Sequence, residues 1–151
     1  MGLPFYQPKT ETTNQKLNTN QKEQNIMSHF TTIQTQIRDV AALKDACAEL
    51  GLELLRDATA RGFADQTRHG ELVIKLKGPY DIAASRADEN DSYELATDWW
   101  GSHVEKEVGQ NYGRLIQLYG VHKTIREANK KRLRVTRKQE EDGTIKLTLA
   151  A

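Results

Sequence analysis

Cysteine is almost absent from this sequence, and its scarcity limits both the compartment and the chemistry. Cys47 is the only cysteine, so the chain can form no internal disulfide and no cysteine-based metal cluster. It falls on the apolar side of a predicted helix, which favours a small core residue over a reactive nucleophile. A reducing compartment is therefore the expected setting.

Long apolar runs and a strong charge of one sign are also missing. No segment approaches the roughly 18 consecutive apolar residues of a membrane span, and none has the layout of a signal peptide. A net charge of +1 over 151 residues argues against a protein committed as a whole to nucleic acid or to an anionic membrane. With 37% hydrophobic and 28% charged residues, the composition is that of one soluble globular domain.

The common motifs of metal, nucleotide and nucleophile chemistry do not occur. The four histidines never stand as a close pair on one helix turn, so a metal site would have to be assembled from distant segments. Neither a phosphate-cradling glycine loop nor a Gly-x-Ser-x-Gly nucleophile motif is present. We therefore expect no cofactor and no metal, and we regard an enzyme as the less favoured class.

The chain is expected to begin with a polar tail over residues 1–26. The segment 7–25 holds a single aliphatic side chain, Leu17, and cannot bury enough surface to offset the entropy of ordering. Structured patterning begins directly after Met27, which makes this residue an alternative start. We expect residues 27–151 to form a single domain.

Strand-like alternation dominates the first part of this domain. Alternating β-branched residues predict a strand over 29–37. Asp39 is expected to cap a helix over 40–50, which Gly51 ends. Four further alternating segments are expected, beginning with a short strand at Leu52 and continuing at Leu72, Tyr80 and Tyr93, with turns at 61–63, 78–79 and 88–91.

A long helix is predicted from Val104 to Ala128. Each of Gly109, Gly113 and Gly120 costs about 1 kcal/mol against alanine in a helix interior, so we expect close backbone approach, a kink near Gly120 or a break into two helices. Two last strands are predicted to pair across a two-residue turn, Asp142-Gly143.

The resulting order is β-α-β-β-β-β-α-β-β. Because it is rich in hairpins, it predicts an α+β fold, a single domain with a mainly antiparallel sheet and two helices on one face. It contains no repeated unit of the solenoid kind.

Several short motifs are distinctive in combination: Met27-Ser28-His29-Phe30, Ile33 to Asp39, Leu43, Leu50-Gly51, Arg61-Gly62, Tyr80-Asp81-Ile82, Tyr93-Glu94-Leu95, Asp98-Trp99-Trp100-Gly101 and Glu141 to Ile145. Together they resemble the hypothetical chloroplast reading frame thirty-five family of cyanobacteria and algal plastids. The resemblance covers essentially Met27 to the C-terminus. It implies a cyanobacterial cytoplasm or a plastid stroma as the location, and it assigns no reaction.

The sequence Asp98-Trp99-Trp100-Gly101 places both tryptophans where a strand passes into a helix. Adjacent side chains of a strand face opposite ways, so one indole is expected to be exposed. The corner is either a packing hub or a binding surface. Asp98 is interpreted as a helix cap, with His103 and Glu107 as a surface pair.

A sharper alternative at the same corner is catalytic. Asp98 and His103 would then form a general base with Tyr93 or Tyr112 nearby, in a pocket beside Trp99 and Trp100. This interpretation requires the three side chains to converge on one cavity.

Positive charge is concentrated late in the chain. Residues 105–138 hold 10 Lys and Arg against 3 Asp and Glu, whereas residues 27–104 hold 8 against 13. Cations near a helix C-terminus complement its dipole, which explains part of the cluster as a solvated face. The alternative is an anionic partner, contacted chiefly by Lys130, Lys131, Arg132 and Arg134. Aromatic residues are missing from this block, which makes nucleic acid a weaker candidate than an acidic protein.

The sequence thus favours a non-enzymatic accessory or protein-interaction module with two surfaces, Trp99/Trp100 and the basic block 126–138. A small-molecule-binding or catalytic domain is the second hypothesis, and a weak nucleic-acid binder acting through the basic block is the third.

Overall fold

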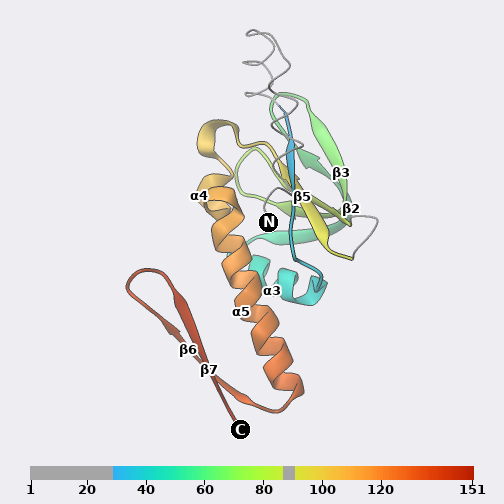
Figure 1. The fold of residues 1–151 in the computed structure, drawn as a ribbon. Helices are drawn as coiled ribbons and strands as arrows, with labels where there is room; N and C mark the ends of the chain where they lie inside the picture. Colours follow the sequence, from blue (N-terminus) through green and yellow to red (C-terminus); the bar gives the residue numbers. More distant parts are fainter. Residues whose placement is uncertain (1–28, 87–90) are drawn as a thin grey trace, which may run out of the picture.

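A five-stranded antiparallel sheet in the order β1-β5-β4-β3-β2 organises the molecule (Figure 1). The computed structural model describes residues 29–86 and 91–151, so the expectations for the tail 1–26 and for most of the turn 88–91 lie outside the described residues. The strands are β1 (Thr31–Gln34), β2 (Glu53–Arg61), β3 (Thr67–Lys75), β4 (Ile82–Arg86) and β5 (Tyr93–Thr97). The expected mainly antiparallel sheet is confirmed, although β2 is a nine-residue strand where a short one was expected.

Two helices, α3 (Val40–Glu49) and α5 (Gly113–Lys130), pack against each other and against one face of the sheet. Alternation along the strands directs Leu72, Ile82 and Leu95 to this face, where they are fully buried with the helices. The opposite face carries a smaller cluster that includes Val73 and Ala83. This arrangement confirms the α+β fold with both helices on one face.

Helix α3 begins and ends as the sequence predicts. The Asp39 carboxylate accepts a hydrogen bond from the Ala42 N–H at 3.1 Å, which satisfies one free donor of the first turn. Gly51 follows the helix with φ at 77°, a conformation that favours glycine. Cys47 is completely buried, and burial raises the pKa of its thiol to about 12. The residue is therefore part of the core, as expected.

The helix predicted from Val104 to Ala128 is interrupted, but not where a kink was expected. The short turns η2 (Trp100–Ser102), α4 (Glu105–Val108) and η3 (Gln110–Tyr112) precede α5. The break lies at Gly109, whose φ is 87°. A side chain does not fit there, because a Cβ atom on this residue would lie 2.8 Å from the Arg114 backbone nitrogen. Gly120 lies inside the continuous α5. The expected break into two helices is confirmed, and the alternative prediction of a kink near Gly120 is wrong.

The last two strands, β6 (Arg134–Gln139) and β7 (Ile145–Ala150), form a hairpin that does not join the main sheet (Figure 1). The Glu140 N–H donates to the Thr144 carbonyl at 2.7 Å, so three residues form the loop instead of the expected two. Gly143, with φ at 92°, supplies the left-handed residue that three-residue hairpin loops need.

Glu49, at the end of α3, holds this hairpin against the helices. Its carboxylate accepts two hydrogen bonds from the Arg137 guanidinium, at 2.7 and 3.0 Å, and lies 2.7 Å from His122 Nε2. Ile145 of β7 packs against the main core. Hydrogen bonds from Arg137 lower the pKa of Glu49 to about 2, against a smaller opposing effect of burial.

We expect Glu49→Gln to release the hairpin, because an amide cannot hold the guanidinium as an ion pair. Amide hydrogen exchange in 134–150 should accelerate at pH 7 while the main sheet keeps its protection. The folded pKa of Glu49 lies below its ordinary 4.5. The carboxylate therefore stabilises the fold above pH 4.5, and the difference between wild type and variant should fade as pH drops from 4.5 toward 2. Equal exchange rates at pH 7 would contradict this role.

Two glycine substitutions should have opposite effects. Gly120→Ala fills open space on a regular helix and should raise the free energy of unfolding by about 1 kcal/mol. Gly70→Ala places a Cβ 2.6 Å from the Leu72 carbonyl and 3.1 Å from the Ala84 nitrogen, so the variant should be destabilised by about 1–3 kcal/mol. Urea unfolding of both variants measures the two effects, and a destabilised Gly120→Ala would show that the helix needs this glycine.

Candidate functional site

The corner after β5 is fixed by the buried carboxylate of Asp98. This residue is 1% exposed and accepts hydrogen bonds from the Trp100 N–H at 3.0 Å and from the Phe63 N–H at 3.2 Å. The first bond joins Asp98 to the residue two positions later and fixes the backbone where η2 begins, but the N-cap residue of η2 is Trp99, so Asp98 is not the expected helix cap. The second reaches the β2–β3 turn, a contact that no local sequence rule predicts.

The two tryptophans point in different directions from this corner. Trp99 packs against the core, with its ring 4.9 Å from that of Tyr112. Trp100 is 39% exposed and meets Phe63 edge to face at 6.1 Å. One indole thus serves packing and the other reaches the surface, as expected, although both residues lie after the end of β5 and strand alternation is not the cause.

Phe63 also borders an open groove of about 520 Å³. The β2–β3 turn forms one wall, and Pro79 and Tyr80 form the other. Because Trp100 contacts Phe63, the exposed indole stands at the edge of this groove. The groove therefore combines apolar and aromatic walls with the partly exposed Arg61.

The three residues considered for catalysis do not form one cluster of contacts. The His103 ring meets Tyr80 edge to face at 5.4 Å, and the Asp98 charge acts on the same tyrosine, because burial first and then Asp98 raise the pKa of Tyr80. Tyr93 stands at the other end of β5, about 16 Å along the chain from Asp98, and its hydroxyl lies 3.3 Å from Arg86 Nε. His103 thus contacts Tyr80, whereas Tyr93 contacts Arg86.

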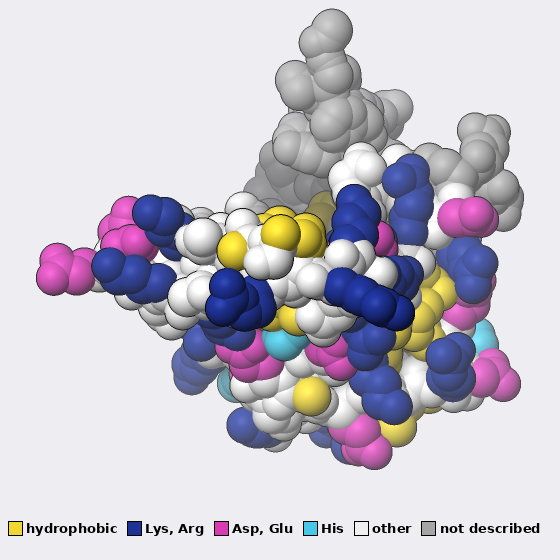
Figure 2. Space-filling view, turned by 90° about the horizontal axis from the view of Figure 1, so that it is seen from below, with side chains coloured by type: hydrophobic (Ala, Val, Ile, Leu, Met, Phe, Trp, Pro, Cys, Tyr) yellow, Lys and Arg dark blue, Asp and Glu magenta, His cyan; other side chains and the backbone are white. Residues whose placement is uncertain are grey.

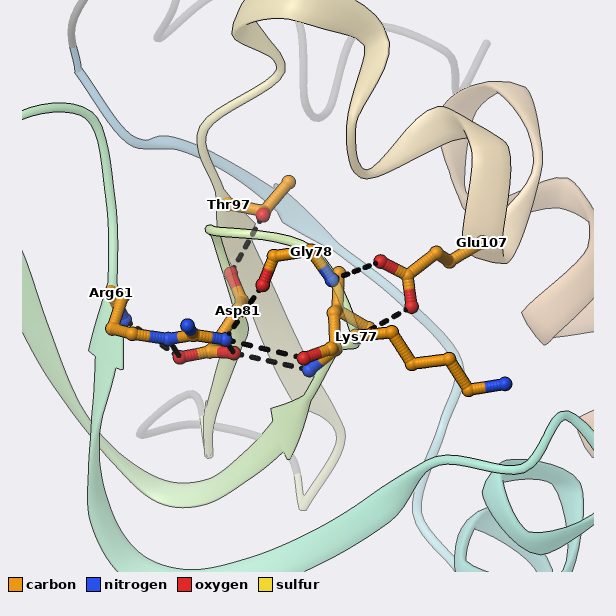
Figure 3. Close-up of polar contacts among 7 residues, drawn as sticks. Arg61, Lys77, Gly78, Asp81, Thr97 and Glu107 are labelled. Carbon is orange, nitrogen blue, oxygen red and sulfur yellow. Dashed lines mark hydrogen bonds and ion pairs between the residues drawn. The ribbon is translucent and has the colours of Figure 1, made fainter.

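Behind the groove, Arg61 and Asp81 form a network that joins four strands (Figure 3). The Arg61 guanidinium donates to both Asp81 carboxylate oxygens, at 2.7 and 2.8 Å, and to the Leu76 and Gly78 carbonyls. Asp81 also accepts from the backbone N–H groups of Arg61 and Leu76, and its own carbonyl accepts from the Thr97 hydroxyl at 2.8 Å. Burial by itself raises the pKa of Asp81, but these hydrogen bonds outweigh it and hold the pKa below its ordinary value.

Glu107 attaches the helical segment to the same place. Its carboxylate accepts from the Lys77 and Gly78 N–H groups at 2.7 and 2.8 Å (Figure 3). The expectation that Glu107 and His103 are a surface pair is corrected by this contact, because Glu107 binds the β3–β4 loop. Arg61, Asp81 and Glu107 were missed as a group, and the available signal was a charged residue, Asp81, between apolar Tyr80 and Ile82.

The basic block divides into paired and unpaired cations. Arg126 pairs with Asp45 at 2.6 Å, Arg137 with Glu49, and Lys130 with Glu127 at 3.5 Å. No ion pair within 29–86 and 91–151 involves the exposed Lys131, Arg132, Arg134 and Lys138. Seen from below, Lys and Arg side chains gather where α5 runs into the hairpin, interspersed with Asp and Glu (Figure 2).

Two further properties concern the described part of the chain. Within it, no three His, Cys, Asp or Glu side chains are grouped so that they could hold a metal ion. None of its helices is long and apolar enough to cross a membrane.

Comparison with known proteins gives a consistent lineage. Residues 46–148 match the model of a family described as "Protein of unknown function (DUF1257)". The chain is 30% identical over 127 residues to "Uncharacterized protein ycf35" of Guillardia theta, covering 82% of this chain and 96% of that protein. It is also 30% identical over 125 residues to the protein of the same name from Pyropia yezoensis, covering 80% and 94%. No solved structure matches the chain. The resemblance noted from the sequence motifs is thereby confirmed.

Asp81→Asn should destabilise the protein at neutral pH, because it removes the charge that compensates Arg61. We expect a loss of about 2–3 kcal/mol in the free energy of unfolding at pH 7. The pKa of Asp81 is lowered in the folded state, so its contribution is present above the ordinary value of 3.8 and fades as pH falls below it. Urea unfolding at pH 7 and pH 3 should show this convergence.

Asp57→Asn is the matched control. This carboxylate pairs with His69 at 3.0 Å but its side chain is 88% exposed, so the change should cost less than about 0.5 kcal/mol. If both variants lose the same free energy of unfolding, the Arg61–Asp81 pair is no more important for stability than an exposed ion pair.

Proposed function

The chain belongs to the DUF1257 family, and we propose that it is a non-enzymatic accessory module that binds another protein. The proposed setting is the cytoplasm of a cyanobacterium or the stroma of a plastid. Its contact surfaces would be the Trp99/Trp100 corner and the basic block 126–138.

The observation that carries this proposal is the exposed indole of Trp100. Trp100 is held in place by the hydrogen bond from its N–H to Asp98 and by the edge-to-face contact of its ring with Phe63. The preceding residue, Trp99, is partly buried and packs against the core. Gly101, with φ at 74°, continues the chain where a Cβ would lie 2.9 Å from the His103 ring. A rigid, partly exposed tryptophan loses little conformational freedom on binding, which is why tryptophan is enriched at the centres of protein interfaces.

The basic block supplies a second, electrostatic contribution. Lys131, Arg132 and Arg134 are exposed and would attract an acidic protein surface. Lys130, also expected in this surface, is already paired with Glu127 at 3.5 Å, although its side chain stays 70% exposed. The corner would thus give affinity, and the unpaired cations would orient the partner.

A small-molecule or catalytic site is the second candidate, favoured by the groove beside Tyr80. The contact of the His103 ring with Tyr80, which lines this groove, supports it. Against it, both Asp98 oxygens are engaged by backbone N–H groups, and Tyr93 contacts Arg86 instead. A carboxylate committed to two donors is a poor general base, so the interaction module is the better supported function.

Site-specific photo-crosslinking tests the proposal. A photoreactive phenylalanine analogue is placed at position 100 and, in a second variant, at position 116. Ile116 is also 39% exposed but belongs to a different element, helix α5. In a cyanobacterial or algal host, position 100 should give a discrete crosslinked protein that position 116 does not give.

The crosslinked partner is then identified and purified, and its affinity is measured directly. Trp100→Ala should weaken binding at least about tenfold, in the range of interface hot spots, while Ile116→Ala should leave it unchanged. If positions 100 and 116 give the same products, or if Trp100→Ala binds normally, the corner is not the contact surface.

A further inference from the structure

Five exposed cations around the C-terminal hairpin have no acidic partner in the described part of the chain. Three of them, Arg134, Lys138 and Lys146, lie on one face of the hairpin, because residues of equal parity along paired strands share a face. Thr136 and Thr148 stand opposite each other on that same face. The other two, Lys131 and Arg132, connect α5 to β6.

Two of these cations sit directly opposite each other. Lys138 of β6 pairs in register with Lys146 of β7, and like charges at such positions destabilise a hairpin. The opposite face, by contrast, pairs Val135 with Leu149 and anchors Arg137 to Glu49. The hairpin thus carries a repulsive pair of lysines on its outward face, and neither lysine is in an ion pair with an acidic residue in the described part of the chain.

Arg132 occupies a second unfavourable position. Its φ is 60°, in the left-handed region where glycine or asparagine is at ease and an arginine is strained. The α5–β6 connection would be more stable with glycine there. A bound anion would offset the repulsion between Lys138 and Lys146, and Arg132 adds a further exposed cation at the left-handed position where α5 ends.

We propose that the outward face of the β6–β7 hairpin, with Arg132, Arg134, Lys138 and Lys146, binds an extended acidic segment of a protein. This inference rests on the interaction module proposed above and names the chemistry of its partner. Arg134 and Lys138 are four residues apart on one strand, about 13 Å. An extended polypeptide repeats its side chains at the same interval, so carboxylates four residues apart would match these two cations.

The hairpin tip argues for a polypeptide over a nucleic acid. Glu140, Glu141 and Asp142 begin two residues after Lys138, and the projecting hairpin carries Asp and Glu side chains at its far end (Figure 2). A continuous phosphate backbone running along the ribbon would meet this negative charge. Residues 126–151 also contain no aromatic side chain, so bases would find no stacking surface.

Fluorescence anisotropy with the full chain tests the proposal. The probes are a labelled poly-glutamate peptide, a duplex DNA and a single-stranded RNA of equal charge, each measured over a salt series. We expect the peptide to bind more tightly than either nucleic acid, and added salt to weaken its binding. Tighter binding of DNA or RNA than of the peptide would overturn the proposal in favour of a nucleic-acid partner.

Two variants with a matched control locate the site. Lys138→Gln/Lys146→Gln should weaken peptide binding at least about fivefold and should raise the melting temperature, because the repulsive pair is gone. Arg132→Gly should likewise bind less and melt higher. Lys44→Gln/Lys106→Gln removes the same charge from exposed positions elsewhere and should bind almost as wild type. If the control loses as much affinity as the hairpin variant, binding is unspecific and the proposal fails.

Failure of this inference and failure of the proposed function are distinguishable. Trp100→Ala should leave poly-glutamate affinity unchanged, whereas the hairpin variants should leave the crosslink at position 100 in place. If position 100 gives no specific crosslink while poly-glutamate still binds to the hairpin, the corner is not a contact surface. If the hairpin variants bind poly-glutamate as tightly as the wild type, the basic face is not the binding site.

Discussion

The Arg61–Asp81 interaction is the constraint on which the candidate site depends. Asp81 is 2% exposed, and a buried carboxylate is tolerated only with its charge and hydrogen-bonding capacity satisfied. Arg61 meets that demand and in the same arrangement fixes the Leu76 and Gly78 carbonyls. The ends of β2 and β3 and the start of β4 are thereby locked together, and Thr97 adds the end of β5. The groove wall and the tryptophan corner rest on this locked edge.

Three further carboxylates connect other segments of the chain to one another. Asp98 ties the β2–β3 turn to η2, Glu107 ties α4 to the β3–β4 loop, and Glu49 ties the hairpin to α3. In each case the carboxylate oxygens already accept hydrogen bonds from backbone N–H groups or from an arginine, which makes them poorly available as proton acceptors in a reaction. The acidic side chains near the corner therefore serve architecture, which is the physical reason that an interaction surface is better supported than a general base.

Sequence rules that concern neighbouring residues correctly predicted the helix ends and the strands. The Asp39 cap, the Gly51 terminus, the buried Cys47 and the alternating strands were all predicted, because capping and side-chain period are properties of neighbouring residues. The break in the long helix was predicted without a position, and the kink was expected at the wrong glycine. Glycines 109 and 120 look alike in sequence, and only the approach of the Arg114 backbone distinguishes them. The separation of the terminal hairpin from the main sheet was likewise invisible, since strand patterns do not say which strands pair.

The sequence by itself determined the fold class, the lineage, the exposed indole and the excess of cations near the C-terminus. Tertiary structure decided which charges are free and which side chains meet. Arg126 and Arg137 are paired with acids that lie 81 and 88 residues earlier in the chain, while Lys138 and Lys146 are left opposing each other by the register of the hairpin. Ion pairing between distant segments depends on packing geometry, and that geometry is set by the whole core and not by any local stretch of residues.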